Sequence, residues 1–302
     1  MPRYKLTVAY DGTDFHGWQK QEPVAPDPSD PKAQKLPEAH ELLEDRHGRV
    51  ALRTAQHVLE QAVRETIREP ITLTGASRTD SGVHAQGQVA AFTSEPDPER
   101  GVGWPADRGC TSLVRALNAR LPDDLLVRSA EIVDERFNPI GDCVSKGYSY
   151  TIHASPMRPL WDRRTVFHTW HEFDVEKMRE AAAHLVGTHD FASLAAANHG
   201  RQTTVRSIFD CTVTDLSSPA QAGEVSAAPT EGVFPSQRLR IDVSGDGFLY
   251  NMVRILAGTL HEVGRGKLDP NQIPAILESK DRTNAGPTLP PEGLRLEWIR
   301  YP

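Results

Sequence analysis

The sequence predicts an α+β fold built on mixed sheets. Strand-like segments cluster between single helix-like segments, and no regular strand–helix–strand repeat of the kind that builds a doubly wound parallel sheet runs through the 302 residues. Apolar and polar residues alternate at 4–10 and again at 238–244, which is typical of half-buried strands. These observations favour an α+β design over a parallel α/β one.

In the N-terminal half, residues 4–10 form the first expected strand. Thr54 is placed to cap a helix, and the apolar face of this helix would carry Val58, Leu59, Ala62, Val63 and Ile67. Short β-prone runs follow at 71–75 and 88–92. A helix is expected to begin at Ser112 and to stop before Pro122, and a further strand to cover 125–132.

In the C-terminal half, Asp174 is placed to cap a helix that ends at Gly187. Its inward face would carry Val175, Met178, Ala182 and Leu185. The strand at 238–244 places Leu239, Ile241 and Val243 on one face, and a helix is expected over 250–263.

The most informative stretch is GASRTDSGVHAQGQVAAF, from Gly75 to Phe92. It sets Asp80 on a tight connection between two strands, with Arg78 before it and His84 after it. T-D-S-G by itself is common turn chemistry, in which the carboxylate caps nearby backbone N–H groups. The same turn can also hold a carboxylate in an open cleft, so Asp80 is the candidate catalytic residue.

The whole string resembles the G-R-T-D-x-G-V-H-A signature of the tRNA pseudouridine synthase A (TruA) family. YDGTDFHGWQKQ, KGYSY, GFLYNMVRILAGTLHEVGRGK and AGPTLPPEGLRL fall in the family's order, so the resemblance covers essentially the full chain apart from inserted loops. Ser77 stands where the family usually has glycine, and Asn138 where it commonly has histidine.

The resemblance implies the pseudouridine synthase fold: two related α/β domains with mixed, largely antiparallel sheets that bound a central cleft, usually within a homodimer. We place an N-terminal domain with the Asp turn at 1–140 and a C-terminal domain with the active-site Tyr and an apolar wall at 141–302. No internal sequence repeat supports this duplication independently.

The implied reaction turns uridine into pseudouridine: the N-glycosidic bond is cut, the base turns, and the sugar is rejoined through carbon. No redox change occurs, so no cofactor is expected. The resemblance assigns catalysis to Asp80, which could attack the sugar or the base or remove a sugar proton, and the sequence does not choose among these routes. On extended backbone Arg78 shares a face with Asp80 and could stabilise it or contact phosphate.

The target base must leave the RNA stack, and contacts in a tight pocket have to offset the free energy of unstacking. By resemblance, Tyr148 stacks on the flipped base and Leu294 lies on its other side. Without the motif, both would be ordinary core residues. Arg254, on the helix after GFLYN, could reach the Asp80 turn or a phosphate, with a solvated helix arginine as the alternative. Tyr150 shares the strand face of Tyr148 and serves as a structural comparison.

Two further sets of residues are expected to meet the RNA. The loop that follows the first strand is expected to shape the cleft and touch RNA through Asp11, Trp18 and Gln19, with turn formation as the alternative for Asp11. Contacts to the RNA backbone are expected from Arg201 and Arg206.

Two other function classes remain open. One is an RNA-binding or RNA-folding protein on the same scaffold without turnover. The other is a hydrolase with paired carboxylates, although no second acid stands beside Asp80. His168 and His171 lack an obvious third ligand, so no metal is expected. The three cysteines, Cys110, Cys143 and Cys211, form no C-x-x-C pair and are expected to be reduced and unliganded.

The net charge of −7 is unexpected for a protein that binds RNA. Segments 22–49, 95–108 and 215–231 together carry −8, so the rest of the chain is nearly neutral and can gather arginines on one face. The expected partner, by resemblance, is tRNA, at positions 38 to 40 of its anticodon arm. No apolar run would span a bilayer and no secretory signal is visible at the N-terminus, so we expect no membrane partner and a cytoplasmic location.

Overall fold

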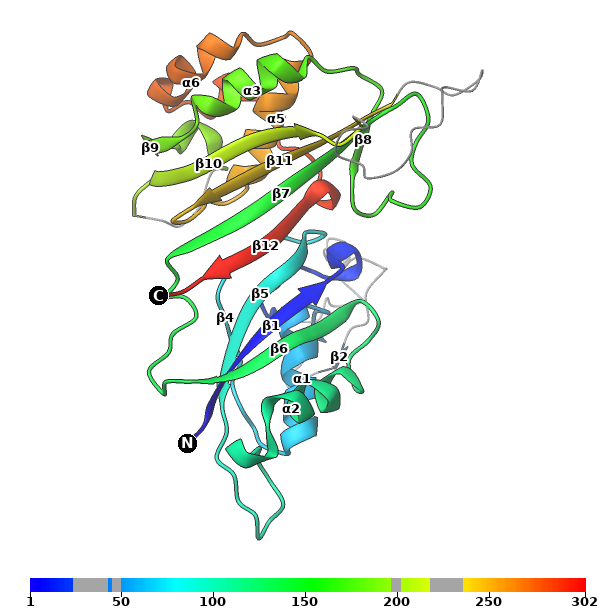
Figure 1. The fold of residues 1–302 in the computed structure, drawn as a ribbon, viewed down its shortest axis with the longest axis vertical. Helices are drawn as coiled ribbons and strands as arrows, with labels where there is room; N and C mark the ends of the chain where they lie inside the picture. The colour runs from blue at the N-terminus through cyan, green and yellow to red at the C-terminus, as the bar shows by residue number, and fades with distance from the viewer. Residues whose placement is uncertain (24–42, 45–49, 197–201, 218–235) are drawn as a thin grey trace, which may run out of the picture. The chain divides into compact units, whose positions relative to one another are not determined.

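The computed structural model describes residues 1–23, 43–44, 50–196, 202–217 and 236–302. The chain forms two compact units (Figure 1). The first unit is Met1–Cys143 with Tyr301–Pro302, and the second is Val144–Arg300. Each unit combines helices with a mostly antiparallel sheet, which confirms the α+β class.

The sheet of the first unit is centred on β1 (Arg3–Tyr10), which pairs antiparallel with β5 (His84–Thr93) and β6 (Leu125–Val133). Alternate residues of β1 are fully or almost fully buried, as the alternating pattern predicted. The short strand β4 (Thr74–Gly75) pairs with β5, and β2 (Leu43–Glu44) pairs with β3 (Val50–Ala51). Helices α1 (Ala55–Ile67) and α2 (Cys110–Asn118) lie next to each other (Figure 1).

The predicted elements of the first unit are present with small shifts. The Thr54 hydroxyl caps α1 by accepting the His57 N–H at 3.3 Å, as expected. The predicted strand at 71–75 is only two residues long. Helix α2 begins two residues before Ser112, directly after Gly109, whose φ of 81° is not helical.

The sheet of the second unit runs in the order β12 (Leu294–Arg300), β7 (Ser145–Ala154), β11 (Gln237–Gly245), β10 (Val205–Asp215) and β9 (Gly187–Asp190), and these neighbours pair antiparallel. One short strand, β8 (Phe167–Thr169), pairs parallel with β7, so the sheet is mixed. Helices α3 (Val175–Ala183), α5 (Met252–Gly264) and α6 (Ile273–Ser279) gather on one side of this sheet (Figure 1).

The strand register gives this second sheet an apolar face and a polar face. Tyr148 is paired with Val243 and Leu296, and Tyr150 with Ile241 and Leu294, so the apolar side chains share one face. The residues between them in sequence carry the other face, on which Thr151 pairs with Arg240 and His153 with Arg238.

Two helix boundaries in the second unit differ from the prediction for backbone reasons. Helix α3 is capped by Asp174 as expected but ends at Ala183, four residues before Gly187. Gly187 has a φ of 117° and is the first residue of β9. Helix α5 begins at Met252 rather than at Tyr250, because Asn251 adopts a left-handed φ of 59°.

Six short 3-10 turns complete the described elements: η1 (Gly12–Asp14), η2 (Ala106–Arg108), η3 (Ala192–Leu194), η4 (Pro270–Gln272), η5 (Arg282–Asn284) and η6 (Pro291–Gly293). Within the described ranges, every helix is too short or too polar to cross a bilayer. The acidic segments 22–49 and 215–231 fall mostly outside the described residues.

Candidate functional site

The Asp80 turn connects β4 to β5 in the first unit. Along this connection Arg78 is exposed, Thr79 is buried and Asp80 is half-buried, so Arg78 and Asp80 lie on the accessible side. The Val83 N–H donates to the Asp80 carbonyl at 3.1 Å, and Gly82 takes a φ of 79°, which closes the turn. Arg78 and Asp80 are therefore both at least partly accessible on this turn.

The backbone that enters this turn is held by one buried amide. Gln88 has no exposed surface, and its Nε2 donates to the Ser77 carbonyl at 2.6 Å while its Oε1 accepts the Ser77 N–H at 3.2 Å. Ser77 is not among the described non-glycine residues with positive φ, so this position does not need the glycine of the family pattern. Gln88 was missed at the sequence level, although a glutamine directly before the apolar run VAAF is the signal that could have revealed it.

The loop after β1 packs closely against the same turn. The hydroxyls of Tyr10 and Thr79 share a hydrogen bond of 2.7 Å, and the Trp18 N–H donates to the Thr79 carbonyl at 3.1 Å. Gly17 has a φ of 82°, and a Cβ there would come within 2.6 Å of the Thr79 carbonyl oxygen. Trp18 is 2% exposed, so its side chain is part of the core, and the expected contact of this loop with RNA stays a prediction.

Asp11 and His84 form a second polar pair in this loop region. The Asp11 side chain accepts the Thr13 N–H at 3.0 Å, which is the turn role that the sequence left open for it. Its carboxylate also lies 3.2 Å from His84 Nδ1. The hydrogen bond from His84, reinforced by Thr13, holds the pKa of Asp11 far below its ordinary value. The Gly12 N–H points at the same ring nitrogen at 3.0 Å. In the tautomer without a hydrogen on Nδ1, this nitrogen accepts from the Gly12 N–H. In the tautomer with a hydrogen on Nδ1, it donates to Asp11.

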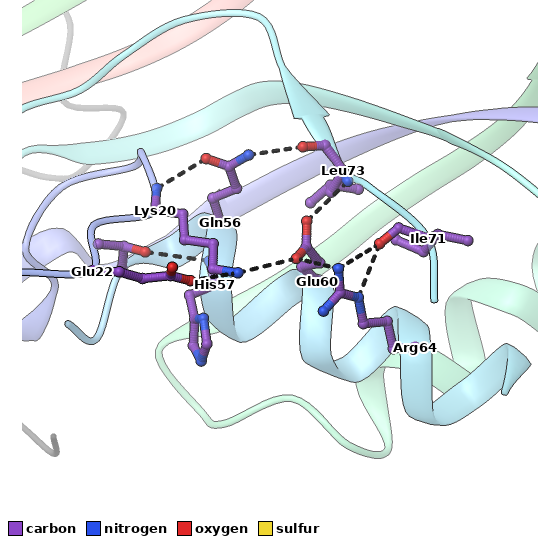
Figure 2. A network of polar contacts seen from close by, with 9 residues as sticks. Lys20, Glu22, Gln56, His57, Glu60, Arg64, Ile71 and Leu73 are labelled. Atoms are coloured by element: carbon purple, nitrogen blue, oxygen red, sulfur yellow. Dashed lines mark hydrogen bonds and ion pairs between the residues drawn. The ribbon is translucent and has the colours of Figure 1, made fainter. Parts of the chain in front are cut away.

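A polar network on α1 fixes the chain that leads into β4 (Figure 2). Gln56 Nε2 donates to the Leu73 carbonyl at 2.7 Å, and the Leu73 N–H donates to Glu60 Oε2 at 3.0 Å. Glu60 is almost fully buried, and Arg64 offsets its charge at 2.8 Å while Lys20 lies 3.7 Å away. Both backbone groups of Leu73 are thus satisfied by helix side chains, which fixes the strand that feeds the Asp80 turn.

Tyr148 lies on β7 in the second unit, on the apolar face of the sheet. It is 6% exposed, and its ring meets that of Phe248 edge to face at a centroid distance of 5.2 Å. Phe248 stands in the segment between β11 and α5, so the ring of Tyr148 is positioned by the GFLYN motif.

Tyr150, Leu294 and Arg254 are brought together around the chain that enters β12. The Tyr150 hydroxyl donates to the Pro290 carbonyl at 2.8 Å, and Arg254 Nε donates to the neighbouring Leu289 carbonyl at 2.7 Å. Burial raises the pKa of Tyr150 well above its ordinary value. Leu294 is paired with Tyr150 across the strands and is 6% exposed. Arg254 therefore holds the loop in front of Leu294 from the first turn of α5.

The remaining candidates, His168, the three cysteines and Arg206, lie elsewhere in the chain and have the following contacts. His168 Nε2 contacts the Ser155 carbonyl at 2.9 Å, and within the described residues no group of three or more possible ligands could hold a metal. Cys110, Cys143 and Cys211 all lie in the described residues, and none of them forms a disulfide. Arg206 Nη1 donates to the Thr203 carbonyl at 3.1 Å, and Arg201 lies outside the described residues.

Comparison with known proteins identifies the family. A family model described as tRNA pseudouridine synthase matches residues 181–302. The chain is 36% identical over 301 residues to the tRNA pseudouridine synthase A of Acetivibrio thermocellus, with 100% of both chains covered. It is 37% identical over 302 residues to the protein of the same name from Geotalea uraniireducens, again with 100% of both covered, and 37% identical over 303 residues to that of Bacillus velezensis, with 99% of each covered. The chain belongs to the tRNA pseudouridine synthase A family.

Proposed function

We propose that this protein isomerises uridine to pseudouridine in tRNA, at positions 38 to 40 of the anticodon arm, without a cofactor. The observation that carries the proposal is the Asp80 turn, which has Asp80 and Arg78 on its accessible side and whose backbone is held at Ser77 by the buried Gln88 amide. Full-length similarity to proteins named tRNA pseudouridine synthase A supports the substrate class.

The reaction requires that the N1–C1′ bond breaks and that a C5–C1′ bond forms. The proton on C5 leaves and N1 gains one, so atoms and electrons balance without an oxidant. In our proposal Asp80 acts in its ionised form, as a nucleophile or as the base that removes a sugar proton. Arg78 stabilises this carboxylate and contacts a phosphate of the RNA.

The flipped uracil is held by residues of the second unit. We assign the stacking surface to Tyr148 and the opposite apolar wall to Leu294. Arg254 acts as a positioning residue, because its guanidinium fixes the carbonyl of Leu289 in the loop ahead of that wall. The hydroxyl of Tyr150 is engaged by Pro290, which favours a structural role for it.

The wider arrangement follows the family resemblance. We propose that residues 1–140 and 141–302 are two related domains, that they bound the cleft that receives the RNA, and that the protein works as a cytoplasmic homodimer without a metal. Measuring the mass of the purified protein in solution tests the dimer.

The test of function is to incubate the purified protein with an unmodified tRNA transcript and to map pseudouridine by sequencing. We expect conversion of anticodon-arm uridines with no free uracil or ribose released. Binding of the transcript without any pseudouridine would instead support the RNA-binding alternative. Release of uracil would support the hydrolase.

A further inference from the structure

One stretch of the second unit exposes large aromatic side chains that the proposed site does not use. It is segment 155–172, which leaves β7, forms β8 and leads to α3. Trp161 is 89% exposed and Trp170 is 71% exposed, the two largest values among the large apolar side chains of the described residues. Met157 and Leu160 in the same segment are 59% and 60% exposed. Such a concentration of exposed apolar surface is typical of a binding surface.

The same segment is rich in arginine. Arg158, Arg163 and Arg164 are all exposed. The segment has two acids: Asp162 is ion-paired at 2.5 Å with Arg238 of β11, and Glu172 is exposed at the end of the segment. In a chain whose net charge is −7, this local collection of guanidinium groups next to indole rings indicates a ligand that carries both negative charge and flat rings.

The segment is attached to the sheet at defined points. His153 of β7 is the strand partner of both Arg238 on β11 and His168 on β8. The ring of His168 meets that of Trp170 edge to face at 5.1 Å, and the Asp162–Arg238 pair ties the loop beside Trp161 to β11. Trp170 therefore lies directly after a strand and Trp161 on a tethered loop, which lowers the ordering cost of binding.

We propose that segment 155–172 binds unpaired nucleotides of the RNA substrate, with bases stacked on Trp161 and Trp170 and phosphates contacted by the arginines. Every base has a π-face, so stacking of this kind tolerates any sequence, while arginine contacts to phosphate fix the position of the strand. The inference rests on the proposed function and deepens it, because it predicts that an unpaired part of the tRNA is recognised away from the target uridine.

A second copy of the chain fits this surface less well. A two-fold dimer contact brings the same patch of both copies together, so the exposed arginines of both copies would be gathered in one interface. Like charges placed opposite each other oppose such a contact, whereas RNA phosphates complement them.

The experiment measures the affinity of the full-length protein for single-stranded oligouridine and for an RNA duplex by fluorescence anisotropy. Stacking contributes about 1–3 kcal/mol per base, so Trp161→Ala with Trp170→Ala should weaken oligouridine binding at least about tenfold. The duplex, whose bases are already stacked, should bind with little change. Phenylalanine at both positions should restore most of the affinity. Phe209→Ala, which removes a 54% exposed ring from β10, is the control.

Salt separates the two kinds of interaction. Replacing Arg158 and Arg163 by alanine should flatten the dependence of log affinity on log salt, by up to about 0.7 for each phosphate that is no longer neutralised. The tryptophan variants should keep the wild-type slope. With unmodified tRNA, the tryptophan variants should raise KM several-fold and leave kcat unchanged.

Three results would overturn the inference. Wild-type affinity of the alanine variants for oligouridine, in a protein that still forms pseudouridine, would reject this surface and leave the proposed function intact. An equal loss for oligouridine and duplex would reject base stacking. If the tryptophan-to-alanine variants sediment as monomers where the wild type is a dimer, and their RNA affinity per chain is unchanged, the surface would be assigned to a second copy instead. Absence of pseudouridine with the wild-type protein would reject the proposed function separately.

Discussion

Replacing Gln88 by methionine keeps the volume of this buried side chain and removes its hydrogen bonds to Ser77. Water cannot take over, because Gln88 has no exposed surface. Each buried backbone group left without a partner costs about 1–3 kcal/mol, and the better burial of an apolar side chain returns part of the cost. We therefore expect a loss of about 3 kcal/mol in the free energy of unfolding.

The same substitution should also slow the reaction in protein that remains folded. Ser77 stands directly before the Arg78–Asp80 run, so its release moves the carboxylate, and a displacement of about 1 Å can cost about a hundredfold in rate. Under conditions in which the variant remains folded, we expect kcat for pseudouridine formation to fall by about two orders of magnitude, with KM for tRNA nearly unchanged.

The matched control is Asn118→Leu. Asn118 also clasps both backbone groups of one residue, since its Nδ2 donates to the Val127 carbonyl at 2.9 Å and its Oδ1 accepts the Val127 N–H at 2.8 Å, but it does so on β6. Urea unfolding should show a loss of stability in both variants, and only Gln88→Met should lose kcat. The reasoning is refuted if Gln88→Met keeps wild-type kcat, or if both variants lose kcat equally.

Three further predictions concern other contacts. Tyr148→Phe keeps the ring and tests the hydroxyl alone, so an unchanged single-turnover rate would indicate a purely stacking role. Asp11→Asn should reduce stability at neutral pH and flatten its acid dependence. The hydrogen bond from His84 lowers the folded-state pKa of Asp11 below the ordinary 3.8, so the stabilisation is present above that value and is lost as the pH falls below it. Urea unfolding from pH 7 down to about pH 2 measures this loss. Arg254→Lys removes the planar donor to the Leu289 carbonyl and should lower kcat for tRNA several-fold while circular dichroism stays unchanged; wild-type kcat would reject the positioning role.

The sequence predicted best those features that depend on local patterns. The alternation at Leu239, Ile241 and Val243 indicated a strand, and in the structure these side chains are at most 2% exposed. The helix caps at Thr54 and Asp174 both form. Period and capping chemistry act over a few residues, so they can be read without knowledge of the rest of the chain.

Contacts between distant segments could not be read in this way. Gln88 clasps Ser77 across 11 positions, and Tyr10 reaches Thr79 across 69. Glu60 lies outside the apolar face predicted for its helix, yet it is 4% exposed because it accepts the N–H of Leu73. Such partners become neighbours only when the sheet forms. The family motif located the Asp80 turn, and the structure adds the side chains that hold it.

The most direct test of this account replaces Asp80 by asparagine, which keeps the size of the side chain and removes its charge. Asp97→Asn is the control, because Asp97 caps the Glu99 N–H at 3.0 Å in another turn of the first unit. We predict that Asp80→Asn forms no detectable pseudouridine in a single turnover with unmodified tRNA while its tRNA affinity stays within a few fold, and that Asp97→Asn is fully active. If Asp80→Asn forms product at the rate of Asp97→Asn, then Asp80 only shapes a turn and is not the catalyst.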